Sequence, residues 1–303
     1  MTILDLGSGS PWSSGILDAL PRRLALTLPE LQLVAAGGAP LPFDLDPQAG
    51  PDQDPDDQAA YAAALASFHD PVTSLSRRGL LDPRGAVDEG VAGAVGLLAV
   101  PAVAVDLELV AGGVHARAWH RQAADAVATL ATVDGLVFEL AWFPAEQWAI
   151  ELARLAVLPE GLPLGVSAVP AVLTVPRGLA DAATEAVHLG RPDLVDVLAA
   201  RHGGAVLDGA GDPLGPAAVT AALVGLATEA RGRLRALVAD ATGGSPGAVG
   251  VVSWTLLADG WHSLTLRQGA GGDRPRLEVR RVGAADLAGG LAPVLATVTG
   301  TAR

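Results

Sequence analysis

The sequence has 303 residues, half of them hydrophobic, so it offers enough apolar material for a sizeable buried core and is not that of a disordered chain. Its formal charge of −13 disfavours binding to nucleic acids and to anionic membrane surfaces. Without cysteine the chain can form no disulfide, thiolate nucleophile or cysteine-based metal site, which fits the reducing cytoplasm. No stretch has the pattern of a signal peptide or a membrane span, so we expect a soluble cytoplasmic protein.

The N-terminal part of the chain combines polar loops with short regular elements. Residues 1–21, rich in Gly, Ser and Pro, are predicted to be irregular. The alternating pattern of residues 22–28 predicts a strand, and Pro29 predicts the start of a helix because its missing N–H costs nothing at the first helical position. The acidic, proline-rich segment 44–58 predicts a solvated loop, and residues 59–68 a short helix.

A turn at residues 79–82 and a helix at 87–98 precede a run of segments with period-two alternation. Strands are predicted at residues 103–109, 114–121, 126–133 and 136–142. Asp134-Gly135 between the last two predicts a hairpin with a type I′ turn, in which both central residues have positive φ.

The next segments are predicted to be helical. A helix is expected to begin at Pro144, and Trp148, Leu152 and Leu155 recur at the spacing of one helical face. The Ala-rich stretch 171–240 is also predicted to be helical, with breaks at glycines and at a loop before Pro216.

The strand pattern returns near the C-terminus. Strands are predicted at residues 249–257, 261–268 and 276–282, followed by a helix whose apolar face contains Leu287, Leu291, Val294, Leu295 and Val298. Asp259-Gly260 is predicted as a second two-residue turn. The two Asp-Gly hairpins, each leading to a helix, predict an internal duplication with repeats of about 22–160 and 161–303.

The clearest candidate for a cofactor site is the glycine-rich segment 3–10, Ile-Leu-Asp-Leu-Gly-Ser-Gly-Ser. It resembles the loop after the first strand of S-adenosylmethionine-dependent methyltransferases, where glycines let the backbone approach a ligand. No regular alternation of strands and helices follows it, although the doubly wound fold of those enzymes requires one. An irregular N-terminal arm is the alternative interpretation.

Other chemical motifs are also weak. His115 and His120 are five residues apart on a predicted strand, so they point to opposite faces and cannot share a metal ion. Ser167 lies in a sequence that lacks the second glycine of a nucleophile elbow, and Ser245 lies in a predicted loop. We therefore expect no catalytic, cofactor or metal site, although residues that meet only in the fold leave an enzyme open.

Tryptophan and arginine side chains are the best candidates for a partner-binding surface. Trp119, Trp254 and Trp261 lie on predicted strands, and Arg117 and Arg121 share the strand face of Trp119. Aromatic side chains and arginine are enriched at protein interfaces. We predict that these five residues bind a partner; packing of each indole beneath a helix is the alternative.

Several segments contribute to a resemblance. They are Gly79-Leu80-Leu81-Asp82, the strands and helix up to Leu158, the early LALTLPELQLVAAGGAPLPF and the late VVSWTLLADGWHSLTLRQGAGGDRPRLEVRRVGAADLAGGLAPVL. Together they resemble the EspG family of actinobacterial ESX (type VII) secretion-associated proteins. The similar features are the Asp-Gly turn, a glycine-rich hairpin tip before Arg-Pro, and a closing helix that begins with a small residue followed by Ala-Asp-Leu.

This resemblance implies a single α+β domain over residues 1–303, with pseudo-twofold halves, a central and mainly antiparallel β-sheet, and flanking helical bundles. It implies a cytoplasmic chaperone, a monomer or weak dimer, that binds the tip of a PPE-like helical substrate in a PE–PPE pair and keeps it soluble for export. The family has no catalytic residues to carry over. The open alternatives are a methyltransferase that uses the N-terminal glycine-rich segment and a structural or regulatory homodimer that pairs through a sheet edge.

Overall fold

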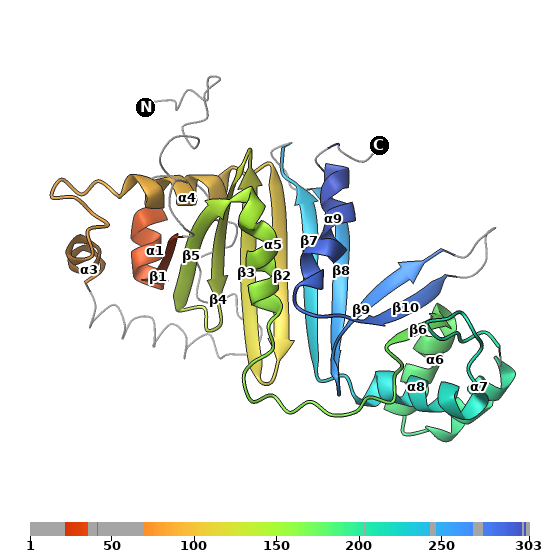
Figure 1. Ribbon diagram of the computed structural model, residues 1–303. Helices are drawn as coiled ribbons and strands as arrows, with labels where there is room; N and C mark the ends of the chain where they lie inside the picture. Colours follow the sequence, from red (N-terminus) through yellow and green to blue (C-terminus); the bar gives the residue numbers. More distant parts are fainter. Residues whose placement is uncertain are drawn as a thin grey trace.

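The computed structural model describes residues 22–35, 41, 70–202, 204–242, 247–268, 275–298 and 300. The predicted arm 1–21, the acidic loop 44–58 and the helix at 59–68 lie outside these residues. The described part of the chain forms one large, twisted β-sheet with helices on both of its faces (Figure 1).

The ten described strands form the sheet in the order β1-β5-β4-β3-β2-β7-β8-β9-β10-β6. Every neighbouring pair is antiparallel. In chain order the strands are β1 (Arg22–Thr27), β2 (Val103–Ala111), β3 (Val114–Ala123), β4 (Ala126–Thr132), β5 (Val137–Pro144), β6 (Val172–Pro176), β7 (Gly232–Asp240), β8 (Gly247–Leu257), β9 (Gly260–Arg267) and β10 (Arg276–Arg281).

The described helices divide between the two halves of the sheet. The first half contains α1 (Leu28–Ala35), α3 (Pro71–Arg77), α4 (Glu89–Ala99), the short 3-10 helix η2 (Ala145–Gln147) and α5 (Trp148–Ala156). The second half contains α6 (Arg177–His188), α7 (Asp193–Arg201), α8 (Pro216–Thr228) and α9 (Asp286–Val298). Each half thus runs from an edge strand through a group of helices to a four-stranded meander and a closing helix, which confirms the predicted α+β fold with pseudo-twofold halves.

The halves meet where β2 pairs with β7, and the central pair of this register is Leu107 and Ala236. The strand order makes β4–β5 equivalent to β9–β10, whose connection lies at residues 268–275. The two Asp-Gly hairpins were expected to be equivalent, and this expectation was wrong. The first joins β4 to β5, whereas the second joins β8 to β9, which corresponds to β3–β4 in the first half.

Two strands lie within the stretch that was predicted to be helical. Residues 172–176 form the edge strand β6, and residues 232–240 form β7 at the centre of the sheet. In β7 the buried Leu234, Ala236 and Val238 alternate with exposed or half-buried residues. This alternation is typical of a strand, but the many alanines in the neighbouring sequence hid the alternation and favoured a helix.

Asp134-Gly135 does not form the predicted type I′ turn, and the second two-residue turn lies one residue earlier than predicted. Among the described non-glycine residues only Ala124 has a positive φ, so neither Asp134 nor Asp259 has the conformation that such a turn requires. The first hairpin closes through a longer loop, in which Asp134 accepts backbone hydrogen bonds from Leu136 and Val137. In the second, Leu257 pairs with Gly260 and leaves Ala258 and Asp259 between the strands.

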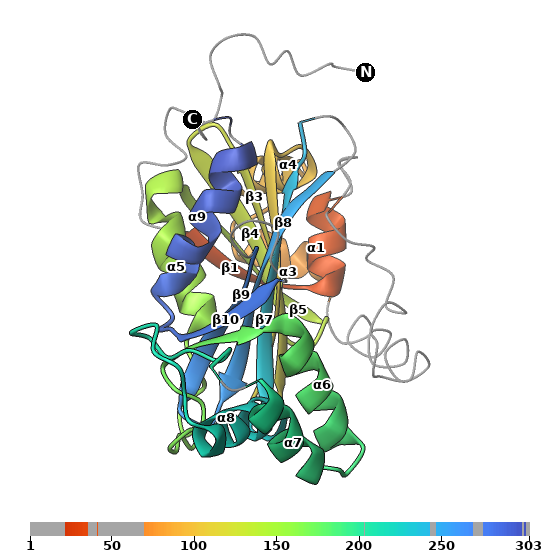
Figure 2. The same ribbon diagram turned by 90° about the vertical axis from the view of Figure 1, so that its right-hand side faces the viewer.

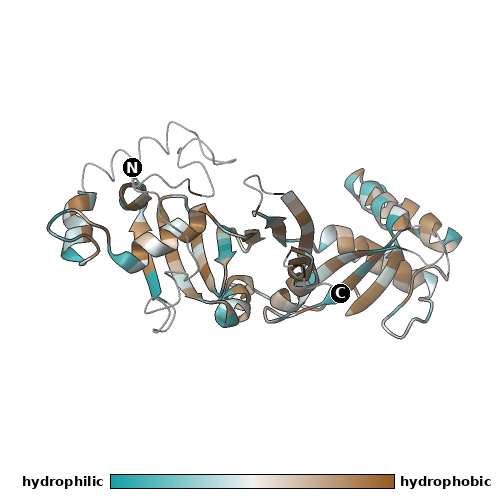
Figure 3. Cartoon of the chain, turned by 90° about the horizontal axis from the view of Figure 1, so that it is seen from above, coloured by the Kyte–Doolittle hydropathy of each residue, from teal (hydrophilic) through white to brown (hydrophobic). Residues whose placement is uncertain are grey.

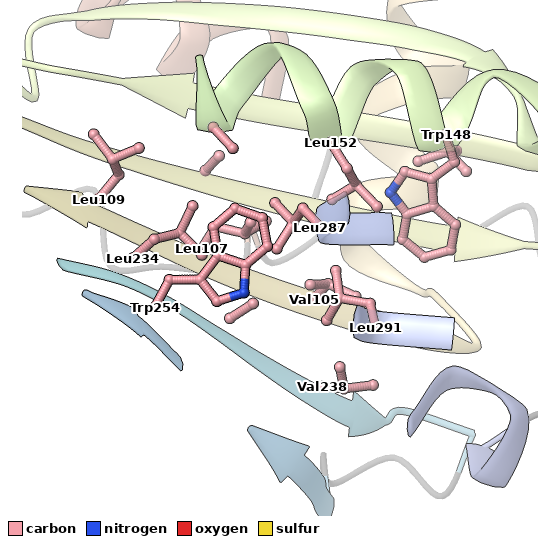
Figure 4. Packing of buried hydrophobic residues seen from close by; sticks show 14 of the residues in the cluster. Val105, Leu107, Leu109, Trp148, Leu152, Leu234, Val238, Trp254, Leu287 and Leu291 are labelled. Atoms are coloured by element: carbon pink, nitrogen blue, oxygen red, sulfur yellow. The ribbon is translucent and has the colours of Figure 1, made fainter. Parts of the chain in front are cut away.

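Helices α5 and α9 lie side by side on one face of the sheet, the α5/α9 face (Figure 2). They seal an apolar core, shown in Figure 4, that is formed by Val105, Leu107, Leu109, Leu234, Val238 and Trp254 of the strands with Trp148, Leu152, Leu287 and Leu291 of the helices. The predicted apolar faces of both helices are thereby confirmed, and α9 continues through Pro293.

The described helices cover the other face, here called the open face, only at its two ends. One end packs against α1, α3 and α4, and the opposite end packs against α6, α7 and α8 (Figures 1 and 2). Seen from above, apolar residues lie in the strands and hydrophilic residues lie on the outer sides of the helices (Figure 3). On this face α4 extends over part of β3, and no helix of the described residues lies over β2 or β7.

A buried polar contact fixes α5 to the sheet. The indole N–H of Trp148 donates to Nδ1 of His120 on β3 over 2.9 Å, and the two rings stack. Burial, aided by the positive charges of Arg121 and Arg154, lowers the pKa of His120 to about 3. The imidazole is therefore neutral in the folded protein at all but strongly acidic pH.

We expect acid to destabilise the fold through His120. The unfolded chain takes up this proton near pH 6.5, whereas the folded state resists it until about pH 3, so stability falls as pH drops between these values by up to about 1.4 kcal/mol per pH unit. His120→Asn keeps an acceptor near Nδ1 but cannot titrate. Urea unfolding at several pH values should show a shallower loss for this variant, and equal slopes would contradict the assignment.

The joint between the halves depends on a close backbone approach at Gly232. A Cβ atom at this position would lie 2.5 Å from the carbonyl oxygen of Val110 and 3.1 Å from Leu256. We expect Gly232→Ala to lower the free energy of unfolding by about 1–3 kcal/mol, because neighbouring strands would have to move. Gly178→Ala on α6 is the matched control, since a Cβ there meets nothing within 4 Å. Denaturant titration of both variants measures the difference, and equal stabilities would contradict it.

Candidate partner-binding surface

The uncovered middle of the open face carries a cluster of charged side chains, here called the central patch. Its members are Glu108 on β2, His115 and Arg117 on β3, and Arg233 and Arg235 on β7. The strand registers place these side chains on one face, because Glu108 lies directly between Arg117 and Arg235 in the sheet. The alternate residues of β2 and β7 are apolar and lie in the core on the other face.

Glu108 is the centre of the patch. Its Oε1 atom accepts from Nη2 of Arg233 over 3.0 Å and lies 3.0 Å from Nε2 of His115. Partial burial acts to raise the pKa of Glu108, but the hydrogen bonds and charges of Arg233 and His115 outweigh it, so the net pKa is lowered. Glu108 is therefore ionised at neutral pH and its charge is already matched.

Arg117 and Arg235 flank Glu108 without an ion pair to any described residue. Arg235 is exposed and Arg117 is half-buried. Three arginines against one carboxylate make the patch positive, within a chain whose formal charge is −13. The surface can therefore attract carboxylates or carbonyl groups of a partner.

Two of the predicted partner-binding residues lie on this surface. Arg117 belongs to the central patch, and Trp119 follows it on the same side of β3. Trp119 is half-buried and packs against the apolar cluster beneath α4. The two residues thus combine an arginine with an aromatic side chain at the border between the patch and the helices.

The other three predicted residues are buried, and their prediction as contact residues was wrong. Trp254 and Trp261 are each 3 % exposed on the α5/α9 face, and the indole N–H of Trp261 donates to the carbonyl of Ala156 over 2.8 Å. Arg121 is 6 % exposed and donates to Asp106 over 2.6 Å and to the carbonyl oxygen of His120. These side chains cannot reach a partner while the helices remain packed.

Sequence reasoning missed Glu108, Arg233 and Arg235 as members of the surface. The two arginines alternate with Leu234 and Ala236, which indicates a half-buried strand. Their meeting with Glu108 depends on the pairing of β2 with β7, which are far apart in the sequence. The alternation could have been found from the sequence, whereas the pairing could not.

The described residues contain no group of three or more His, Asp or Glu side chains that could hold a metal ion. The hydroxyl of Ser167 donates to Glu229 over 2.6 Å rather than to a histidine. The methyltransferase alternative requires a parallel, doubly wound sheet, and every pair of described strands is antiparallel. The glycine-rich segment 3–10 lies outside the described residues.

No helix in the described part of the chain is both long enough and apolar enough to cross a bilayer.

We expect substitutions to separate the buried residues from the surface residues. Trp261→Phe removes the donor to the carbonyl of Ala156 in the core, so it should lower the free energy of unfolding by about 1–3 kcal/mol. Arg117→Ala should change it by no more than about 0.5 kcal/mol, because Arg117 is not part of the core. Chemical denaturation tests both values, and a large loss at Arg117 would show that the side chain is structural.

The architecture of this protein is similar to that of a solved structure. The structure of the Mycobacterium tuberculosis type VII secretion system chaperone EspG5 in complex with the PE25-PPE41 dimer matches with a TM-score of 0.59. The match covers 91 % of this chain and 96 % of the EspG5 chain at 13 % sequence identity. No protein-family model and no curated protein sequence matches the chain. The protein therefore has an EspG-like fold, as the sequence resemblance implied.

Proposed function

We propose that this protein is a cytoplasmic chaperone of type VII secretion that binds a PPE-like helical substrate in a PE–PPE pair and keeps it soluble for export. The observation that carries the proposal is the fold shared with EspG5 along nearly the whole of both chains. That chaperone was solved with a PE25-PPE41 dimer bound. The open face of the sheet supplies a surface on which such a substrate could bind.

The shape of the open face supports a narrow, helical ligand. Two groups of helices cover its ends, one formed by α1, α3 and α4 and the other by α6, α7 and α8. Between these groups of helices, in the described part of the chain, the central patch is accessible, and Trp119 lies at its border with α4. A helical tip fits such a space better than a broad, flat protein surface does.

The chemistry of the central patch supports the same ligand. A helix ends in carbonyl groups without intrahelical partners, and this end carries a partial negative charge. Arg117 and Arg235 can donate to such carbonyls or to carboxylates, while Trp119 can cover apolar side chains of the tip. Covering an exposed apolar tip would prevent its self-association, which is what a holding chaperone must achieve.

This mode of action needs no chemical step. One open face per chain predicts a one-to-one complex with the substrate pair, in which the chaperone is a monomer. The buried indoles of Trp254 and Trp261 then serve to hold α5 and α9 and do not contact the substrate.

Co-expression with a PE–PPE pair encoded beside this gene tests the proposal. We expect all three chains to elute as one complex from size exclusion at micromolar concentration. Arg117→Glu should weaken the complex at least about tenfold, because it places a negative charge in the patch. Isothermal titration measures this loss.

Arg84→Glu is the matched control, since Arg84 is exposed in the loop before α4 and makes the same change of charge. It should bind as the wild type does. Separate elution of the wild-type chaperone and the pair would contradict the proposed function. Equal weakening by both variants would mean that net charge, and not the central patch, controls binding.

A further inference from the structure

The sheet splits between β8 and β9. The two strands pair only from Ser253 with Leu264 to Leu257 with Gly260. Residues 247–252 of β8 therefore have β7 on one side and no strand of the described chain on the other. Residues 265–267 of β9 are likewise paired only with β10. Figure 1 shows the β9–β10 hairpin turning away from β8 at this point.

The two outer edges of the sheet are protected, in contrast to this inner one. At β1 the carbonyl of Ala25 accepts from Arg78 over 2.8 Å. At β6 the backbone of Thr174 exchanges two hydrogen bonds with Leu207, each of 2.9 Å. Proteins usually protect their strand edges in such ways because free backbone groups invite pairing with other chains.

The inner edge lacks two of the usual features that discourage pairing, charged residues and proline, although the register of β7 with β8 shifts at Val238/Ala239 and leaves Val249 as an extra residue. Its sequence, Gly-Ala-Val-Gly-Val-Val, contains no charge and no proline. Val249 is 38 % exposed and Val251 is 45 % exposed, and Val251 lies on the side of the central patch. On the other side α9 lies over the strand, since a Cβ at Gly250 would meet Val294 at 2.7 Å. Residues 247–252 thus form a strand edge that is accessible for pairing, and α9 packs on one side of this strand.

The surroundings of the split are positively charged. The described residues of β9 and β10 contain four arginines and one carboxylate, Glu278. Arg281 is paired with Asp259 and Arg276 donates to the carbonyl oxygen of Ala205, which leaves Arg267 and Arg280 as the arginines nearest to a ligand's charge. Arg267 and Arg280 both bind Glu278 and remain 62 % and 53 % exposed. Arg235 of β7 is exposed on the other side of the split and has no ion pair within the resolved ranges. In a chain of formal charge −13, this concentration of arginines favours an acidic ligand.

We infer that the split is a docking site for an acidic, extended segment of a partner protein, which adds a strand to residues 247–252 of β8. Backbone hydrogen bonds supply the affinity, apolar side chains of the segment cover Val249 and Val251, and its carboxylates face Arg235 and Arg267. The site shares Arg235 with the central patch, but its pairing edge, residues 247–252, lies outside the patch. The peptide experiment uses no PE–PPE pair, so the inference does not rest on the proposed chaperone function.

A fluorescein-labelled peptide of sequence EVSVSVEE tests the inference on the full chain. Fluorescence anisotropy should show binding that weakens as salt is raised. Methylation of alternate backbone nitrogens of the peptide, which removes donors but no charge, should weaken binding at least about tenfold. Val251→Glu should do the same, while Ile150→Glu, on the exposed side of α5, should bind as the wild type does. Hydrogen exchange should show new protection of amides within residues 247–252.

Three results would overturn the inference. The first is absence of peptide binding at low salt. The second is equal affinity for the methylated peptide, which would show that attraction between charges alone accounts for binding. The third is a concentration-dependent dimer in light scattering that protects the same amides without peptide, which would assign the edge to a second copy of the chain.

Discussion

The antiparallel pairing of β2 with β7 is the interaction on which the rest of the structure depends. Nine residue pairs, from Val103–Asp240 to Ala111–Gly232, join two halves of the same architecture into one sheet. An antiparallel pair has a local twofold axis, so this joint relates the halves by rotation about the normal to the sheet. The rotation brings α5 and α9 together on one face and sends the two remaining groups of helices to opposite ends of the other.

This arrangement gives the two faces of the sheet different properties. The α5/α9 face is sealed, and it contains both Trp254 and Trp261 in a continuous apolar core. The open face has two separate apolar clusters at its ends and a polar middle. Burial of the apolar residues of β2 and β7 on one side leaves their charged residues, Glu108 and Arg235 among them, on the other.

The EspG-like fold is shared with a chain that is only 13 % identical, so most individual residues differ between the two proteins. At this identity the surface residues of the two proteins differ, so the binding features of this chain follow from its own residues. Here these are an arginine-rich patch at the centre of the open face and an unprotected inner edge at β8. We propose both as sites for binding another chain, and neither requires a catalytic group.

The sequence by itself determined most local elements, because alternation and helical spacing depend on neighbouring residues. Strands β2 to β5 and β8 to β10, and the apolar face of α5, were predicted in this way. It could not determine which face of a strand is covered, since α5 and α9 reach Trp261 and Trp254 only through long-range packing. The sequence analysis also missed β7, because its apolar residues continue the Ala-rich composition of the helices before it. Without β7, the cross-strand pairing of Arg235 with Glu108 could not be predicted. Only the tertiary structure decided these points, because strand pairing joins residues more than a hundred positions apart.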